Sequence, residues 1–195
     1  HIRSWEIFSG AVTRVISTAP SAVFRLLWWV NPIDQLQYLI TGDYRQPYEI
    51  HIRKWHTPSD CGTLVKTLQG NQTAITELRL VSGEFNGHLL LGCGEDSCIA
   101  MWNLFTGQII KQFSGSFTYL DSMCVIGAQY LVGTCSSGLF WFWKFSKENI
   151  QESDDACVHI EKSASKFRTK NMLYSAKHQT LITKGTDGMI RLRQL

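Results

Sequence analysis

The sequence predicts an all-β protein made of repeated four-stranded sheets. First, an outline built around a tryptophan recurs along the chain, with its anchors spaced by 50, 47, 41 and 50 residues. A period in the forties is typical of one four-stranded sheet per repeat. Second, turns rich in Gly, Asp and Ser separate short apolar runs. Third, the best helix candidate, SASKFRTKNMLYSAKH, lacks an apolar stripe of helical period.

The copies of the outline differ in length and share an order of elements. They read HIRSWEIFSG, IHIRKWHTPSDCG, CIAMWNLFTG, LFWFWKFS and MIRLRQL. In the last copy Arg193 takes the place of the tryptophan. The four tryptophan anchors are Trp5, Trp55, Trp102 and Trp143.

Each anchor is expected to lie in the third strand of its sheet. The apolar runs HLLLG, QYLVG and TLITK precede the turns GCGEDS, CSSG and KGTDG, which predicts a strand, a tight turn and a second strand. After the anchor, Gly10 and Gly107 allow the chain to turn into another strand. The strand around Trp102 is apolar on both faces. Such strands are covered on both sides, as in sheets stacked around a ring.

Composition fits a globular chain and restricts the classes of partner. The chain has 195 residues, 44% of them hydrophobic, and a net charge of +3. Residues 162–195 hold eight basic side chains and only one acidic side chain, Asp187. This local charge of +7 predicts attraction to an acidic partner or to nucleic acid, and a solvated basic edge is the simpler interpretation.

The cysteine and hydropathy patterns indicate an intracellular protein, cytoplasmic or nuclear. No Cys or His cluster has the spacing of a zinc site, so buried reduced thiols are expected. The longest apolar stretch, AVFRLLWWV, is too short to cross a bilayer and contains Arg25, so membrane insertion is not expected. The six cysteines are Cys61, Cys93, Cys98, Cys124, Cys135 and Cys157.

No catalytic, metal or cofactor motif is evident. The glycines of LGCGEDS lie in a strand-to-strand turn, with no helix to hold a pyrophosphate, and no HExxH or GxSxG motif is present. The turn GTCSSG accounts for Cys135 without a nucleophilic role. The acidic segment KENIQESDDA is typical of a solvated loop. The chain is therefore expected to be no enzyme and to need no cofactor.

The segments LLLGCGEDSCIAMWNLFTGQIIKQF and LITKGTDGMIRLRQL resemble the WD-repeat β-propeller family. The resemblance implies that Asp96 and Asp187 are the turn aspartates that hold the hairpin by hydrogen bonds, and that Trp5, Trp55, Trp102 and Trp143 are the family's tryptophans. The sequence also departs from the pattern. Asn71 and Ser116 replace the family's histidine, Ser137 replaces a turn aspartate, and the second copy carries the insertion DYRQPYE.

The resemblance implies a β-propeller segment of about four four-stranded blades plus a partial one. The expected single domain is 1–195, with a partial blade at 1–18 and blades at 19–62, 63–107, 108–150 and 151–195. Because propellers of this family usually close with seven blades, the segment is expected to be incomplete at its N-terminus.

The expected function is that of a scaffold that binds other proteins in a multi-subunit complex. Loops on rigid scaffolds carry recognition, and Tyr and Arg anchor interfaces. On the family's geometry one rim would gather the candidate partner-binding residues, although aromatic side chains in such loops also pack on their own blade. These residues are Tyr44, Arg45, Tyr48, Asn71, Phe117 and Tyr119.

Two other functions remain open from the sequence. A nucleic-acid-associated propeller would use the basic C-terminal stretch and the aromatic side chains of Trp28, Trp29 and Trp141. For Trp28 and Trp29, which lie in an apolar strand-like run, core packing is the simpler role. A propeller enzyme would need polar residues that converge on the central channel, and the sequence identifies none.

Overall fold

The protein was analysed as a computed structural model. The described residues are 1–17, 22–55, 62–70, 72–81, 88–96, 98–114, 120–127, 130–145, 159–162 and 168–194. Within these ranges the chain is all-β, with seventeen strands and no helix. This confirms the predicted fold class at the level of secondary structure.

The strands form a series of antiparallel sheets in chain order. A hairpin comes first, followed by three four-stranded sheets and one three-stranded sheet, each with sequential neighbours. The hairpin is β1 (Ile2–Trp5) and β2 (Val12–Ile16); the next sheet is β3 (Val23–Val30), β4 (Gln37–Asp43), β5 (Ile50–Lys54) and β6 (Leu64–Leu68). Then come β7 (Glu77–Val81), β8 (Leu89–Cys93), β9 (Cys98–Asn103) and β10 (Ile109–Ser114). The last two sheets are β11 (Leu120–Ile126), β12 (Tyr130–Cys135), β13 (Leu139–Lys144) and β14 (His159–Lys162), and β15 (Thr169–Ser175), β16 (Thr180–Gly185) and β17 (Ile190–Gln194).

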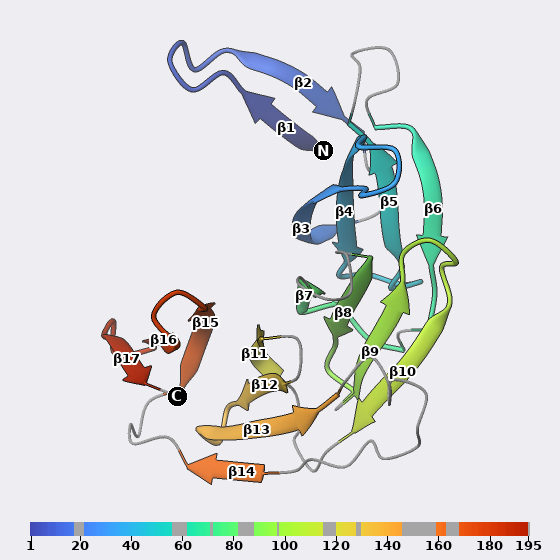
Figure 1. Cartoon of the computed structure of the whole chain (residues 1–195). Helices are drawn as coiled ribbons and strands as arrows, with labels where there is room; N and C mark the ends of the chain where they lie inside the picture. Colours follow the sequence, from blue (N-terminus) through green and yellow to red (C-terminus); the bar gives the residue numbers. More distant parts are fainter. Residues whose placement is uncertain are drawn as a thin grey trace.

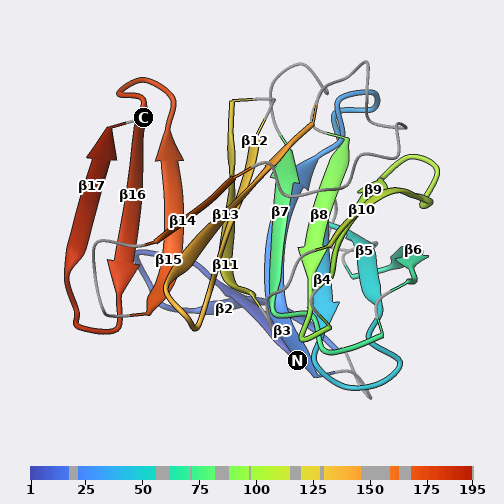
Figure 2. The ribbon, with the colours of Figure 1, turned by 90° about the horizontal axis from the view of Figure 1, so that it is seen from below.

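The sheets are arranged as an open arc. The first strand of each sheet lies on the inner side, and β3, β7, β11 and β15 are neighbours in that order (Figure 1). The hairpin β1–β2 and the sheet β15–β17 form the two ends of the arc, and among the described residues no strand joins them (Figures 1 and 2). The described strands therefore form repeated, open sheets, and closure into a WD-repeat propeller stays a prediction.

The sequence repeats and the sheets are offset by one strand. The sequence predicts blade boundaries after residues 62, 107 and 150. In the structure these boundaries lie before β6, β10 and β14. Each of these strands pairs with the third strand of the sheet before it. A sheet therefore takes its fourth strand from beyond the predicted boundary. The last sheet has three strands among the described residues.

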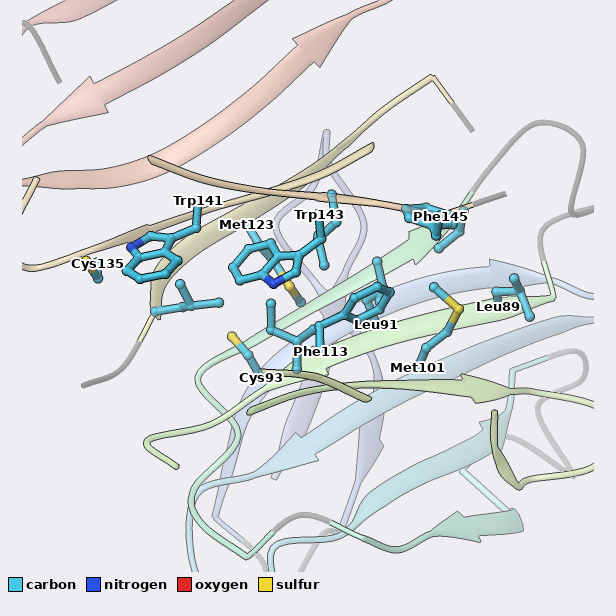
Figure 3. Close-up of a cluster of buried hydrophobic side chains, with 14 residues drawn as sticks. Leu89, Leu91, Cys93, Met101, Phe113, Met123, Cys135, Trp141, Trp143 and Phe145 are labelled. Carbon is cyan, nitrogen blue, oxygen red and sulfur yellow. The ribbon is translucent and has the colours of Figure 1, made fainter. Parts of the chain in front are cut away.

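The core lies between adjacent sheets. Figure 3 shows Trp143 and Phe145 facing Phe113, with Leu91, Met101 and neighbouring side chains around them. The Phe113 ring centroid lies 6.5 Å from that of Trp143 and 6.1 Å from that of Phe145, in edge-on arrangements. Because a strand in the middle of the arc packs on both faces, its residues are apolar at consecutive positions.

The hairpin β1–β2 covers only part of the face of the first four-stranded sheet that it contacts. Ile2 and Ile16 of the hairpin pack against Leu39 of β4. The same face of β3 remains exposed, although Leu27 and Trp29 on the opposite face pack into the core toward β7–β10. The exposed side chains alternate along β3 and are Phe24, Leu26, Trp28 and Val30. This exposed row is called the β3 face below.

Candidate interaction site

Charged side chains link the inner strands of the first three sheets. Glu77 on β7 forms two ion pairs through Oε1. Its partners are Arg25 of β3, with Nε at 3.6 Å, and Arg79 of its own strand, with Nη1 at 3.0 Å. Arg79 also donates from Nε to the Met123 carbonyl of β11 at 3.1 Å. These contacts join β3, β7 and β11, which are the inner strands of three neighbouring sheets.

A second charged group links β11 to β15. The carboxylate of Asp121 receives Arg168 and Lys170, with Lys170 Nζ at 3.2 Å from Oδ1. Next to it, the backbone N–H of Met172 donates to Ser122 Oγ at 3.1 Å. Together with the Arg25–Glu77–Arg79 group, these contacts form a charged ladder on the inner strands.

Bulges place the ladder residues. The pairing with the second strand shifts by one residue between Val23 and Arg25, between Leu120 and Ser122, and between Thr169 and Asn171. A bulge turns the side chain of its extra residue away from the regular alternation. The extra residues include Asp121 and Lys170, the two partners of one ion pair.

Burial controls the protonation of the two ladder carboxylates. Desolvation raises the pKa of Glu77 and outweighs the opposing effects of Arg79 and Arg25. Desolvation also raises the pKa of Asp121, against the lowering effect of the hydrogen bond from Lys170. Each carboxylate is bonded to a cation of the same ladder. The arrangement therefore crosslinks the sheets and neutralises their charges.

The insertion between β4 and β5 borders the ladder. Tyr44 and Arg45 are exposed, and Tyr48 is half-buried with φ of 58°. The ring of Tyr44 lies 5.2 Å from that of Phe24, and the Arg25 guanidinium lies 4.5 Å from the Phe24 ring centroid. This cluster of Phe24, Arg25 and Tyr44 is called the aromatic rim.

A buried polar group flanks the insertion. Asp43 is fully buried, and its Oδ2 lies 3.6 Å from His51 Nδ1, while His51 Nε2 lies 3.3 Å from Glu49 Oε2. Gln69 donates from Nε2 to Glu49 Oε1 at 3.0 Å. Backbone hydrogen bonds hold the insertion, since Asp43 N donates to the Glu49 carbonyl at 3.1 Å and Tyr44 N donates to the Ala22 carbonyl at 2.8 Å, while Tyr44 and Arg45 are exposed.

The predicted binding residues are only partly brought together. Tyr44 belongs to the aromatic rim, and Arg45 and Tyr48 follow it in the same insertion. The other three predicted positions, Asn71, Phe117 and Tyr119, lie outside the described residues.

The predicted structural residues differ in burial. Trp102 and Trp143 are fully buried, and Trp102 Nε1 donates to the Gln69 carbonyl at 3.1 Å. In contrast, 56% of Trp5 is exposed. The carboxylate of Asp187 accepts a hydrogen bond from Met189 N at 3.2 Å and pairs with Arg191 across the β16–β17 turn. Asp96 is half-buried, and its Oδ1 is buried without a hydrogen-bond partner.

When the third strands of the two sheets are aligned by their backbone pairing, Trp55 lies two residues beyond the position equivalent to Trp102. The backbone N–H of Trp55 donates to Gln37, as Leu104 N donates to His88. Trp55 is therefore level with Leu104, and Arg53 is level with Trp102. The indole of Trp55 instead packs edge-on against Trp28, with ring centroids 5.7 Å apart.

The sequence analysis missed the charged ladder and the exposure of Trp28. The first strand of each sheet has a charged residue near its start, and this is the sequence signal for the ladder. It can be recognised only when these strands are aligned with one another. Trp28 was expected to pack in the core, yet 45% of it is exposed, whereas Trp29 and Trp141 are buried. A continuous apolar run does not show which of its two faces has a neighbouring sheet.

Within the described ranges no disulfide bond is present, and three of the four cysteines are buried. Burial raises the pKa of Cys93 and of Cys124 to about 12. Cys61 and Cys157 lie outside the described residues. Within the described part of the chain, no group of three or more His, Cys, Asp or Glu side chains is arranged to hold a metal ion. No helix long and apolar enough to cross a membrane occurs there either.

Comparisons with known proteins identify a shared fold only. No protein-family model and no curated protein matches the sequence. The computationally designed Ika4 protein is similar in structure, with a TM-score of 0.67 and 13% identity over 93% of this chain and 96% of that chain. The computationally designed Ika8 protein gives a TM-score of 0.69 and 15% identity over 98% of this chain and 51% of its own. This chain thus spans about half the length of Ika8.

Proposed function

We propose that this chain is a non-catalytic, WD-repeat-like β-propeller segment that acts inside the cell as a scaffold and holds protein partners within a multi-subunit assembly. The observation that carries the proposal is the exposed β3 face, which continues into the aromatic rim. Contiguous exposed apolar side chains with an arginine at their border are typical of protein interfaces.

The charged ladder supports a scaffold role in a different way. Its carboxylates are bonded to arginine and lysine side chains on neighbouring strands, which ties the inner strands to one another. Acid–base catalysis needs a carboxyl or imidazole that reaches a substrate with a suitable protonation state. The ladder carboxylates are instead engaged with cations, so the ladder is suited to holding neighbouring sheets together.

Ion pairs weigh against the nucleic-acid alternative. In the basic C-terminal stretch, Arg168 and Lys170 bind Asp121, Arg191 binds Asp187, and Arg193 binds Glu161. Phosphate binding would have to compete with these pairs. Among the described side chains of this stretch, the exposed lysines outside these pairs are Lys177 in the β15–β16 turn and Lys184 on β16.

Quantitative affinity capture tests the scaffold function. The immobilised chain is compared with a Phe24→Ala/Tyr44→Ala double variant, in nuclease-treated extract and over a series of salt concentrations. We expect the wild-type chain to retain specific proteins and the rim variant to lose most of at least one of them, because truncating buried aromatic anchors costs about 2 kcal/mol or more each.

A Phe8→Ala variant is the matched control. Phe8 is almost fully exposed in the β1–β2 turn, far from the rim along the hairpin. Its loss should leave capture unchanged. Equal recovery by the rim variant would exclude the rim as a binding surface. Recovery that disappears after nuclease treatment and falls steeply with salt would support nucleic-acid binding instead.

A further inference from the structure

A cavity in the β7–β10 sheet contains a carboxylate that has no cation beside it. The cavity has a volume of about 250 Å³ and lies next to the turn between β8 and β9, where the connection from β6 to β7 passes. Its described lining residues are Gly70, Gln72, Asp96, Cys98, Ala100 and Gln112. Among them, Asp96 is the only acidic or basic residue other than the thiol of Cys98.

The described side chains do not compensate the charge of Asp96. Its Oδ1 is buried and accepts no hydrogen bond. None of the ion pairs between described residues includes Asp96. Removing a carboxylate from water is unfavourable unless a cation or hydrogen-bond donors surround it. The cavity therefore presents an acceptor for a positively charged group.

The position of Ala100 is occupied by a large side chain in the other sheets. In the four sheets of three or four strands, the anchor position of the third strand pairs with a leucine of the second strand. The residues two positions before the anchor are His51 in β5, Ala100 in β9, Trp141 in β13 and Arg191 in β17. Because Ala100 is small, it leaves room beside the turn that contains Asp96.

The last sheet shows which group fits beside such a turn. Arg191, at the position equivalent to Ala100, binds Asp187 through both terminal nitrogens of its guanidinium, with Nη1 3.1 Å from Oδ1. Asp187 precedes Arg191 by four residues, as Asp96 precedes Ala100. The β7–β10 sheet therefore keeps the carboxylate of this pair and has an alanine in place of the guanidinium.

The two aspartates also have the same orientation in their turns. A Cβ added at Gly94 would lie 3.3 Å from Oδ1 of Asp96. A Cβ added at Gly185, the equivalent glycine, would likewise meet Oδ1 of Asp187. Both carboxylates thus fold back over the glycine two positions before them. The comparison between the two turns therefore holds for the side chains as well as for the backbone.

We propose that this cavity binds an arginine side chain of a partner protein. The guanidinium pairs with Asp96, in the place that Arg191 takes beside Asp187. The exposed side chains of Gln72 and Gln112 line the cavity, and their amide oxygens are acceptors for the remaining N–H groups. A planar guanidinium suits a carboxylate better than an ammonium does, which favours arginine over lysine. This inference rests on the proposed scaffold function and names the chemistry of one partner.

Short peptides with blocked ends test this inference on the 195-residue chain. In otherwise identical peptides, a single arginine, lysine or citrulline is flanked by glycine and serine. Binding is followed at low salt by NMR, from the backbone amide signals of the isotope-labelled chain. We expect saturable binding of the arginine peptide, with the largest shifts at Glu95, Asp96 and Cys98.

The other two peptides separate shape from charge. Citrulline has nearly the shape of arginine without its charge, so its peptide should bind at least about tenfold more weakly. Lysine keeps the charge without the planar group, and its peptide should also bind more weakly. Equal binding by the citrulline or the lysine peptide would overturn the proposal, and so would an arginine peptide that does not bind.

Asp96→Asn removes the charge and keeps the shape of the side chain. It should weaken binding of the arginine peptide by about tenfold or more. Stability in urea should stay equal or rise, because no described cation loses a partner. A purely structural turn aspartate predicts the opposite, namely lower stability and unchanged binding. Asp187→Asn is the matched control: it breaks the pair with Arg191, so it should lower stability slightly and leave peptide binding unchanged.

Ala100→Arg introduces a guanidinium into the cavity from within the chain. It should pair with Asp96, as Arg191 pairs with Asp187, and abolish peptide binding. In a double-mutant cycle of urea unfolding, Ala100→Arg should therefore be more favourable with Asp96 present than with Asp96→Asn. Absence of this coupling in folded variants would contradict the proposal. If Ala100→Arg does not fold, the peptides and Asp96→Asn still decide the matter.

Affinity capture separates this inference from the scaffold function. We expect Asp96→Asn to lose a protein that the wild-type chain and Asp187→Asn retain. A chain that captures proteins equally well with Asp96→Asn, and binds no arginine peptide, contradicts this inference alone. A chain that binds the arginine peptide but captures no protein contradicts the scaffold function alone.

Discussion

Trp102→Ala and Trp5→Ala should destabilise the chain by very different amounts, although both residues are anchors of the repeated outline. Trp102 is fully buried, and its indole N–H is bonded to the Gln69 carbonyl, whereas more than half of Trp5 is exposed. Removing a buried tryptophan side chain costs about 3–5 kcal/mol of unfolding free energy. For Trp5 we expect a loss of about 1 kcal/mol or less, because most of its surface already contacts solvent.

Urea unfolding followed by circular dichroism measures both losses without relying on tryptophan fluorescence. The two variants remove the same atoms, so each is the control for the other. Equal losses would contradict the assignment of Trp102 to the space between two sheets. A loss below about 1 kcal/mol for Trp102→Ala would have the same meaning.

The inner strands and the buried core respond to pH and to substitution in three measurable ways. Because burial raises the pKa of Glu77 above its ordinary value of 4.5, the folded carboxyl keeps its proton longer than the unfolded one, and the unfolding free energy falls as pH rises from 4.5 through the raised pKa. Glu77→Gln should remove this part of the pH profile in urea titrations, and an unchanged slope would assign it to another group. With pKa values of about 12, the thiols of Cys93 and Cys124 should react with iodoacetamide at neutral pH only after unfolding; rapid labelling of the folded chain would contradict their burial. A Cβ added at Gly92 would lie 2.9 Å from Cζ3 of Trp102, so Gly92→Ala should cost about 1–3 kcal/mol in the same unfolding assay, and a stability equal to wild type would show that the sheet adjusts freely.

The sequence predicts the strands of this fold well because their signals are local. The run before Trp102 and the turn after it specify a strand, a turn and a further strand, and these appear as β8, β9 and β10. The anchors Trp102 and Trp143 both lie in third strands, as the repeat predicts. In the second copy the tryptophan lies two residues beyond the anchor position, level with Leu104.

The candidate site was harder to predict because it depends on neighbouring sheets. Trp28 and Trp29 are adjacent in an apolar run, yet only Trp29 faces another sheet. The ion pairs of Asp121 connect residues that are far apart in sequence, and a bulge places the carboxylate. A local sequence pattern does not predict where a bulge shifts the register, nor which strand of the neighbouring sheet lies opposite. The exposure of Tyr44 and Arg45 could be expected from the sequence, because an insertion interrupts an otherwise regular repeat.

Hydroxyl-radical footprinting of the free chain tests the central claim, that the sheets form an open arc with an uncovered apolar face at each end. Trp28 and Met189 are 45% and 59% exposed at opposite ends, whereas Trp102 and Met123 are fully buried between sheets. We predict fast oxidation of Trp28 and Met189 and slow oxidation of Trp102 and Met123, at chain concentrations low enough to prevent self-association. Trp28 and Met189 oxidised as slowly as Trp102 and Met123 would contradict the open arc and the binding surface proposed on the β3 face.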